Sequence, residues 1–332
     1  MKRILTGDRP TGDRFHLGNY YGKLKNTLKL QDEYEVFIPI VDLHALTTHF
    51  DKTADFKKNI FGLMLDYLAV GLDPEKVTFF IQSSVPEVLE LAFILGCLTP
   101  RSIIAKQPAL KEKLDQGEQD TVGLFYYPVL MAADILLPRA NLVTVGKDQK
   151  AHVEYAKDIA IKFNNLYGEV FPLPETLIPK DIGTLPGTDG QAKMGKSLNN
   201  AIFLSDNADI VEKKVMGMYT DPNRIKATDP GNVEGNPVFI YLEAFAPESE
   251  KGQISEYISR YRAGQVGDIE VKKYLVKILN DFLEPIRSKR AELEKQPDLI
   301  EEILKQGNQR AREEGQKTLA QVKEVMKLNY LP

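Results

Sequence analysis

The chain has 332 residues, 43% of them apolar, which is enough to bury a large core and to form two domains. No stretch approaches roughly 18 consecutive apolar residues, so the composition excludes a transmembrane helix, and the first residues lack the apolar run of a secretory signal. A formal net charge of −4 argues against a protein that coats nucleic acid, and it confines any RNA binding to a local basic patch.

Short apolar runs alternate with amphipathic stretches of helical length through the first half of the chain. The apolar runs predict strands at residues 3–6, 36–41, 77–81 and 142–145. The amphipathic stretches predict helices at about residues 17–34, 53–70, 85–98, 128–137 and 149–167. This alternation is typical of a Rossmann-like, doubly wound parallel sheet with helices on both faces, in which ligands bind beyond the carboxyl ends of the strands.

The composition changes after Phe171, where prolines and glycines crowd about twenty residues and predict a loop that leads out of the sheet. No strand is expected beyond it. Helices are predicted at about residues 205–220, 250–262, 268–290 and 299–328, with an irregular stretch at 231–237. We therefore expect a sheet domain over residues 1–200 and an all-helical domain over residues 201–332, whose last helix is a candidate to pack back on the first domain.

Cysteine and histidine are rare in this chain. The single cysteine, Cys97, lies in an apolar helical stretch, and we expect it in the core. One cysteine permits no internal disulfide, which indicates a reducing compartment, the cytoplasm. Four scattered histidines add none of the spacings that hold zinc or an iron–sulfur cluster, so no protein-bound metal is expected.

The loop after the first predicted strand reads GDRPTGDRFHLGNY over residues 7–20 and opens the first helix. His16 and Asn19 lie three residues apart at the helix start and therefore face the same side. Gly18 between them leaves the backbone open to a flat ligand, and the free N–H groups of a helix start bind anions. The pattern predicts a nucleotide site, the alternative being a histidine that only caps the helix.

A second loop at the domain boundary reads KMGKS over residues 193–197. Two lysines three residues apart beside a glycine suit a mobile clamp on a polyphosphate, although such a pair taken alone is usually solvated surface. The combination is more specific than either loop. A His-x-Gly-Asn segment after the first strand, followed much later by Lys-Met-x-Lys-Ser, resembles the two marker motifs of class I aminoacyl-tRNA synthetases.

Within that class, the chain resembles the bacterial tryptophanyl-tRNA synthetases over nearly its whole length. The segments that carry the resemblance are TGDRPTG at 6–12, IVDLHALT at 40–47, YLAVGLDP at 67–74, FIQS at 80–83, LMAADILL at 130–137, VGKDQK at 145–150, LPGTDG at 185–190 and YTDP at 219–222. The chain departs from the family at three positions. Gly195 stands in place of a serine, Arg9 in place of a glutamine and Lys147 in place of an acidic residue.

The resemblance implies an enzyme that activates L-tryptophan with ATP, which brings Mg²⁺, and transfers it to tRNA(Trp). It implies a homodimer without a membrane partner. The helical domain would bind the anticodon, and candidate basic contacts are Lys213, Lys214, Arg224, Lys226, Lys272, Lys273, Lys277, Arg287 and Arg290. The alternatives are a tyrosyl-tRNA synthetase, a paralogue that binds tryptophan or RNA without catalysis, and a small adenylyltransferase with the same first loop.

The resemblance also assigns site residues. The ATP site would include Arg9, Pro10, Thr11, Gly18, Asn19, Gly146, Lys147, Asp148, Lys193, Met194, Gly195, Lys196 and Ser197, and catalysis would depend on His16, Asn19, Lys193 and Lys196. Tryptophan would contact Asp134 through its indole N–H, Tyr127 and Gln149 through its head group, and Leu5, Val41, His44, Met131, Val143 and Val145 around its ring. No side chain attacks the substrate in this family, so catalysis is positioning and electrostatic stabilisation.

Asp134 is the most informative of these residues on physical grounds. It interrupts the apolar run at residues 130–137, where an unpaired charge would be costly to bury. An acceptor for the indole N–H explains its presence there. The alternative is a carboxylate that points outward or accepts from a backbone donor.

Overall fold

The computed structural model describes residues 1–146, 149–177, 185–190, 193–221, 224, 226 and 228–330. Five strands form one parallel sheet in the order β3-β2-β1-β4-β5. Their bounds are Arg3–Leu5 for β1, Glu35–Ile40 for β2, Val77–Ile81 for β3, Leu142–Thr144 for β4 and Glu175–Leu177 for β5. The four predicted strands are confirmed to within a residue or so at each end.

The prediction of an uninterrupted loop after Phe171 is wrong, because β5 lies within that stretch. This strand has only three residues, and Pro172 and Pro174 stand just before it. The segment becomes a strand because it pairs with β4, where Thr176 lies opposite Val143. Such a strand is set by tertiary contacts rather than by local propensity.

The helices predicted for the first half are present, together with several shorter ones. Their bounds are Leu17–Asn19 for α1, Tyr20–Leu24 for the π-helical turn η1, Lys25–Leu30 for α2, Asp42–His49 for α3, Thr53–Asp55 for η2, Phe56–Ala69 for α4, Gln82–Ser84 for η3, Glu87–Leu98 for α5, Arg101–Ile104 for α6, Pro108–Asp115 for α7, Val122–Leu136 for α8 and Lys150–Tyr167 for α9. Helix α8 begins earlier than predicted, because Thr121 caps it and Pro128 is accommodated within it. The short helices α3, α6 and α7 were not predicted.

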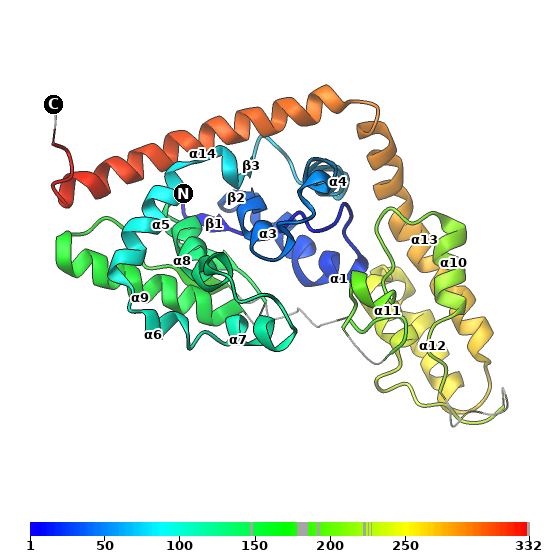
Figure 1. Ribbon diagram of the computed structural model, residues 1–332. Helices are drawn as coiled ribbons and strands as arrows, with labels where there is room; N and C mark the ends of the chain where they lie inside the picture. The colour runs from blue at the N-terminus through cyan, green and yellow to red at the C-terminus, as the bar shows by residue number, and fades with distance from the viewer. Residues whose placement is uncertain are drawn as a thin grey trace.

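The second half contains η5 Lys196–Leu198, α10 Ala208–Met216, α11 Pro237–Phe245, η6 Glu248–Glu250, α12 Lys251–Arg262, α13 Asp268–Leu293 and α14 Pro297–Val325. Helix α10 starts after Asn207, which caps it, because the side chain of Asp206 instead accepts from Phe203 N in a preceding turn. Helix α11, capped by Asn236, was not predicted. Helices α10 to α13 gather at one end of the molecule, away from α5 and α9 (Figure 1).

Both faces of the sheet are buried, as a parallel sheet requires. Alternate residues of a strand point to opposite faces. Ile38 and Phe79 therefore belong to a core that continues into α4 and α13, whereas Phe37 and Phe80 belong to a second core with α5, α8 and α9. The first core thus joins the sheet to the helices at the far end.

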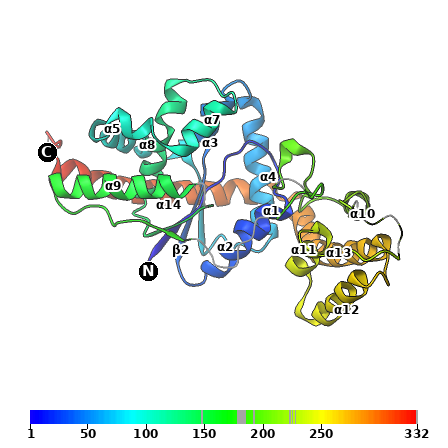
Figure 2. The ribbon, with the colours of Figure 1, turned by 90° about the horizontal axis from the view of Figure 1, so that it is seen from below.

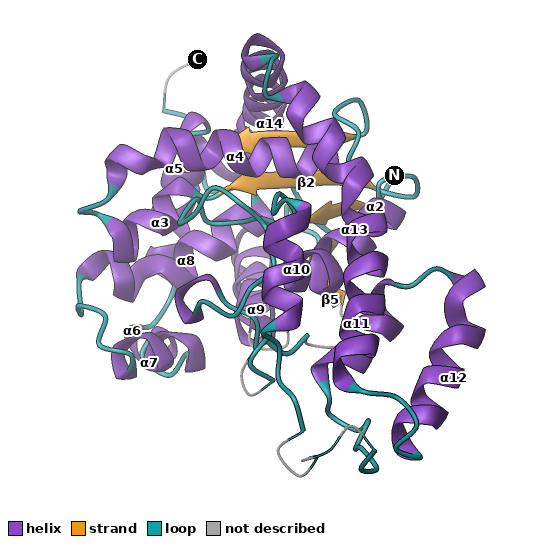
Figure 3. Ribbon diagram, turned by 90° about the vertical axis from the view of Figure 1, so that its right-hand side faces the viewer, coloured by secondary structure: helices purple, strands orange, loops and turns teal. Residues whose placement is uncertain are grey.

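Helix α14 returns from that end and covers the edge strand β3 (Figure 1), and Figures 2 and 3 show this helix from two further directions. Gly307 lies so close to this strand that a Cβ built there would meet Phe79 O at 1.7 Å. Next to it, Asn308 Oδ1 accepts a hydrogen bond from Ile81 N at 2.8 Å. The β3 edge of the sheet is therefore covered, and one of its backbone donors is satisfied by a side chain.

The expectation that Cys97 lies in the core is wrong, because the residue is exposed. It follows Leu89 and Phe93 at intervals of four residues on α5, and both of these side chains are also exposed. Residues four apart share a helix face. The apolar composition of α5 therefore serves two faces, one in the core and one on the surface.

Candidate active site

A cavity of about 510 Å³ opens at the carboxyl ends of β1, β2 and β4. The chain runs from β1 to β2 on one side, and β4 pairs with β1 on the other, so the strand order reverses at this point. Such a reversal leaves a crevice in which parallel-sheet proteins bind ligands. The size suits a small-molecule ligand.

His16 caps the first helix and also lines the cavity. Its Nδ1 accepts from Asn19 N at 3.2 Å, and Asn19 Oδ1 accepts from His16 N at 3.0 Å. Burial, reinforced by the charges of Lys196 and Lys193, lowers the pKa of His16 to about 4. The ring is therefore neutral at pH 7, and because Nδ1 is an acceptor, the proton sits on Nε2. His16 therefore caps the helix and also keeps an N–H donor, and its role at a nucleotide stays a prediction.

The two loops are held together by a short antiparallel contact. Leu17 N donates to Ile202 O, and Leu204 N donates to Phe15 O, both at 2.9 Å. Residues 202–204 follow the lysine loop in the chain, so this pairing brings the loop over the start of the first helix. The Nζ of Lys196 then lies close to Gly12, where a built Cβ would meet it at 2.7 Å.

The two lysines of the loop are placed differently. Lys196 lines the cavity, whereas Lys193 is exposed and does not. Lys196 is also exposed, but desolvation lowers its pKa, and the carboxylates of Asp8, Asp13 and Asp66 oppose this shift. The positive charge of Lys196 is thus available at the mouth of the cavity.

Gly18 does not line the cavity, and its predicted contact with a ligand stays a prediction. A Cβ at this position would meet His16 Nδ1 at 3.0 Å and Met194 Cβ at 3.4 Å. Met194 is buried, and its Sδ accepts from Gly18 N at 3.3 Å. The glycine therefore makes room for the histidine ring and for the methionine of the lysine loop.

Asp134 is buried, and it lines the cavity. Its Oδ2 receives hydrogen bonds from His44 Nε2 at 2.8 Å and from Gln82 Nε2 at 2.8 Å, and its Oδ1 receives one from Gln82 Nε2 at 2.7 Å. The side chain neither points outward nor depends on a backbone donor. Its partners come from α3 and η3, whose side chains meet only in the folded chain.

The remaining wall of the cavity is aromatic and cationic. Burial raises the pKa of Tyr127 to about 12, so its hydroxyl stays protonated, and it pairs with His152 Nε2 at 3.1 Å. Lys113 of α7 lies 5.6 Å from the centre of the Tyr127 ring. Arg9 is held by Thr48, while its Nε has no partner among the described residues. Two positive side chains facing one cavity suit an anionic ligand.

Most of the predicted site residues line the cavity. These are Leu5, Arg9, Thr11, His16, Asn19, Val41, His44, Tyr127, Met131, Asp134, Val143, Val145, Gly146, Gln149 and Lys196. Pro10, Gly18, Lys193, Met194 and Gly195 are placed elsewhere. Lys147, Asp148 and the side chain of Ser197 lie outside the described residues.

Several lining residues were not predicted: Thr6, Gly7, Asp8, Phe15, Lys23, Pro39, Thr47, Leu63, Lys113 and Thr144. Thr6, Pro39 and Thr144 could have been found from their positions at strand ends. Lys113 offered no such signal, because a lysine on a short polar helix looks like any solvated residue.

The basic residues of the helical half are divided between internal and exposed positions. Lys272 is buried and donates to Met218 O at 2.7 Å and to Thr220 Oγ1 at 2.8 Å, and Arg224 is buried beside Asp268. Arg287 and Arg290 likewise donate to internal acceptors. Exposed positions are held by Lys213, Lys226, Lys273 and Lys277. Among the predicted basic contacts, these four lysines are the exposed ones and Lys214 is half-buried; their contact with RNA stays a prediction.

No helix in the described part of the chain is long and apolar enough to cross a membrane. A search of the same residues finds no group of three or more His, Cys, Asp or Glu side chains that could hold a metal ion.

Comparisons with known proteins agree with the geometry. The family model for tRNA synthetases class I (W and Y) matches residues 1–284. The chain is 52% identical to the tryptophan–tRNA ligase of Treponema pallidum, with 100% of this chain and 98% of that protein covered. It is 47% identical to the tryptophan–tRNA ligase of Streptococcus mutans, with 98% of each chain covered.

Solved structures give the same answer. The structure of tryptophanyl-tRNA synthetase from Campylobacter jejuni, complexed with ADP and tryptophan, has a TM-score of 0.88 and 37% sequence identity, and the match covers 98% of this chain and 99% of that one. The chain therefore belongs to the class I tRNA synthetases for tryptophan and tyrosine, and within them to the tryptophan–tRNA ligases.

Proposed function

We propose that the cavity binds L-tryptophan beside ATP, forms tryptophanyl-adenylate and pyrophosphate, and then passes tryptophan to tRNA(Trp). The observation that carries this proposal is the state of Asp134. A carboxylate offers roughly four lone-pair sites; His44 Nε2 bonds Oδ2, and the amide nitrogen of Gln82 is shared between Oδ1 and Oδ2. Among the described residues Oδ1 accepts from Gln82 alone, so it keeps an acceptor position, and Asp134 lines the cavity. An indole N–H would complete the set, whereas an apolar ring without a donor would leave that site unpaired.

The ring of the substrate would lie among the apolar side chains at the ends of β1 and β4. Leu5 and Val143 are buried there, with Val41 and Met131 completing the wall. The amino and carboxylate groups would then face Tyr127 and Gln149. This orientation leaves the carboxylate directed toward the first loop, where ATP would bind.

The phosphates of ATP, with Mg²⁺ as part of the substrate, would lie between the first helix and the lysine loop. His16 Nε2–H would donate to a phosphate oxygen without adding charge. Lys196 would balance the charge of the polyphosphate. Lys113 and Arg9, which also line the cavity, would attract a phosphate or the substrate carboxylate. The likeness to a synthetase solved with ADP and tryptophan supports one site for both ligands.

In this arrangement, an oxygen of the tryptophan carboxylate attacks the α-phosphorus, and the bond from that phosphorus to the bridging oxygen of pyrophosphate breaks. No proton has to be removed from the attacking group, because the carboxylate is already ionised at pH 7. The side chains therefore have to align the two substrates and stabilise charge that moves onto pyrophosphate.

We further propose that residues 1–200 carry out this chemistry and that the helices beyond them bind the anticodon. A homodimer is supported by the exposed apolar stripe of Leu89, Phe93 and Cys97 on α5 and by exposed Val122 of the adjacent α8. Such a stripe is suited to a two-fold contact between copies. Because tRNA charging serves translation, we place the enzyme in the cytoplasm.

Pyrophosphate exchange into ATP tests the proposed function. The purified protein should catalyse exchange with tryptophan and scarcely with the other nineteen amino acids. Exchange driven best by tyrosine would point to a tyrosyl-tRNA synthetase. Absence of exchange with every amino acid, from a protein that binds tryptophan, would point to a non-catalytic paralogue.

A further inference from the structure

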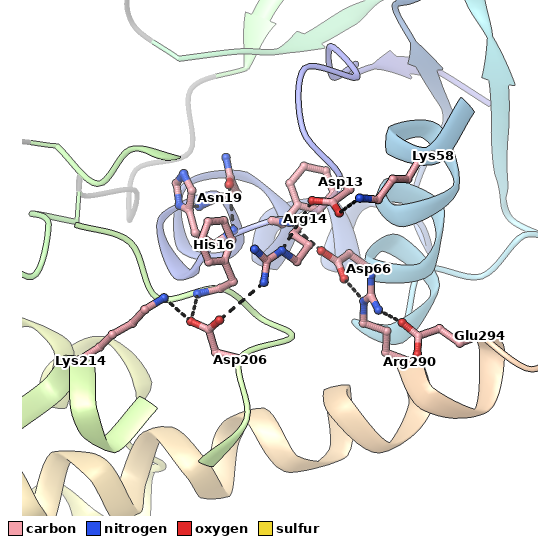
Figure 4. A network of polar contacts seen from close by, with 12 residues as sticks. Asp13, Arg14, His16, Asn19, Lys58, Asp66, Asp206, Lys214, Arg290 and Glu294 are labelled. Atoms are coloured by element: carbon pink, nitrogen blue, oxygen red, sulfur yellow. Dashed lines mark hydrogen bonds and ion pairs between the residues drawn. The ribbon is translucent and has the colours of Figure 1, made fainter. Parts of the chain in front are cut away.

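A buried carboxylate outside the cavity connects the first loop to α13. Asp66 of α4 is fully buried and does not line the cavity. Its Oδ2 accepts from Phe15 N at 2.6 Å, and its Oδ1 accepts from Arg290 Nε at 2.7 Å. Figure 4 shows the carboxylate between the backbone that precedes His16 and the guanidinium of Arg290. Each oxygen thus holds a different part of the chain.

Helix α4 holds the first loop through one face. Asn59 Nδ2 donates to Pro10 O at 2.8 Å. Only glycine fits at position 62, because a Cβ there would meet Asp13 O at 2.2 Å. Asp66 lies one turn further along the same face and bonds the backbone directly before His16. Positions 59, 62 and 66 share a helix face. The loop is therefore fixed against α4 from its first turn to the histidine.

Helix α13 reaches the same region through a second arginine. Arg287 Nη1 donates to Asp206 O at 3.1 Å, one turn before Arg290. The carboxylate of Asp206 accepts from Phe203 N at 2.9 Å and from Lys214 at 2.6 Å, and it lies 3.8 Å from Arg14 (Figure 4). The segment around Phe203 is the one that pairs with residues 15–17. Both strands of that contact are thus tied to α13.

We propose that Asp66 is a positioning residue for the ATP site: it sets the backbone before His16, and its ion pair with Arg290 ties that setting to α13. The inference rests on the proposed role of His16 at the phosphates. It adds a physical link by which a displacement of the helical half would reach the ATP site without touching the cavity.

Burial of Asp66 makes this link sensitive to its partner. Desolvation raises the pKa of the carboxyl, and the charge of Arg290 together with the amide of Phe15 opposes the rise. A buried carboxylate that loses its cation is left with an uncompensated charge or takes up a proton. Removing Arg290 should therefore disturb the hydrogen bond to Phe15 N even though the two groups do not touch.

Four variants separate the elements of the proposal. Asp66→Ala removes both bonds. Asp66→Asn keeps an oxygen for Phe15 N but loses the charge, and Arg290→Met removes the cation. Glu294→Gln is the matched control, because Glu294 is the other carboxylate on Arg290 and lies on the exposed side of α13.

We expect Asp66→Ala and Arg290→Met to raise KM for ATP and lower kcat, so that kcat/KM for ATP in pyrophosphate exchange falls by about ten- to a hundred-fold. KM for tryptophan should change less than about two-fold, since the tryptophan wall is not involved. Asp66→Asn should retain most of the activity, and Glu294→Gln should match the wild type. Full activity in a folded Asp66→Ala protein would overturn the proposal.

NMR of His16 gives a readout that does not depend on activity. In Asp66→Ala the titration midpoint should move up from about 4, because a loosened loop lets water reach the ring. If Asp66→Ala does not fold, the double variant Asp66→Ala with Arg290→Met takes its place, because it lacks the bond to Phe15 N and leaves no unpaired arginine charge. An unmoved midpoint contradicts the positioning role. If the wild type shows no exchange activity but the midpoint of His16 still moves in Asp66→Ala, the positioning role of Asp66 is upheld and the proposed function is rejected.

Discussion

His16 shows how a capping hydrogen bond decides the chemical form of a titratable side chain. Its Nδ1 is occupied by the amide of Asn19, and burial beside two lysines disfavours a second proton. The ring is therefore fixed as a neutral donor through Nε2. A protonated imidazole would bind phosphate more strongly, but its ground-state attraction for ATP would not by itself accelerate the reaction.

This state of His16 predicts a titration. With four histidines in the chain, the ring signals can be assigned by substitution, and in the free enzyme the midpoint of His16 should lie near pH 4 rather than near the usual value of about 6.5. Because the folded pKa is below the unfolded one, the unfolded chain takes up a proton first as pH falls. The free energy of unfolding should thus decrease from about pH 6.5 toward pH 4. A midpoint above pH 6 would contradict this account.

At the scale of elements, the lysine loop has room for a side chain at Gly195, where the related synthetases are expected to have a serine. Gly195 has an extended backbone, and a Cβ there would find Leu198 Cδ1 at 3.5 Å, which is an ordinary contact. Gly195→Ser should therefore leave kcat/KM for ATP within about three-fold of the wild type. Gly18→Ala should lower it much more, since the new methyl group would press on the His16 ring at 3.0 Å. Equal effects of the two substitutions in steady-state exchange assays would refute this distinction.

The contact between α14 and β3 gives a prediction on stability. Gly307→Ala would place a methyl group on the carbonyl of Phe79, so α14 would have to move off the strand. We expect a loss of about 1–3 kcal/mol in the free energy of unfolding. Gly252→Ala on α12 is the control, because a Cβ there has nothing within 4 Å, and alanine is the better helix residue. Denaturant melts that rank the two variants alike would show that α14 is not held at this point.

For the whole molecule, the split between internal and exposed cations predicts which of them touch RNA. Lys273 and Lys277 are exposed and lie on one face of α13. Changing both to glutamine should weaken tRNA charging and its dependence on salt, while pyrophosphate exchange stays at the wild-type rate. The same change at Lys305 and Lys317 of α14 serves as a control for net charge. Equal losses of charging from both pairs would contradict a local RNA surface.

The sequence was sufficient for the parts of the fold that depend on local patterns. Short apolar runs predicted the strands β1 to β4, the loop after the first strand pointed to His16, and a charge inside an apolar run pointed to Asp134. Strand β5 could not be predicted, because three residues among prolines carry no periodicity and pair only through β4. The buried state of Lys272 also escaped prediction, since its backbone acceptors meet it only in the folded chain.

The partners of Asp134 illustrate the same limit within the site. A charge inside an apolar run indicated a special role, but Gln82 and His44 lie many residues away in sequence and on different elements. Their hydrogen bonds decide which lone pair remains for a ligand. The proposed specificity for indole would therefore be a property of the assembled pocket, although its main residue could be found from the sequence.

The most direct test of the account compares kcat/KM for tryptophan with that for the benzothiophene analogue, in which sulfur replaces the indole N–H. A site that leaves a buried acceptor unpaired can reject such an analogue by roughly 10⁴–10⁵. In Asp134→Ala this preference should fall by about a hundred-fold or more, and Asp134→Asn, which keeps an acceptor oxygen, should be milder. Melting curves establish that each variant is folded. An unchanged ratio in folded Asp134→Ala would contradict the claim that this carboxylate recognises indole.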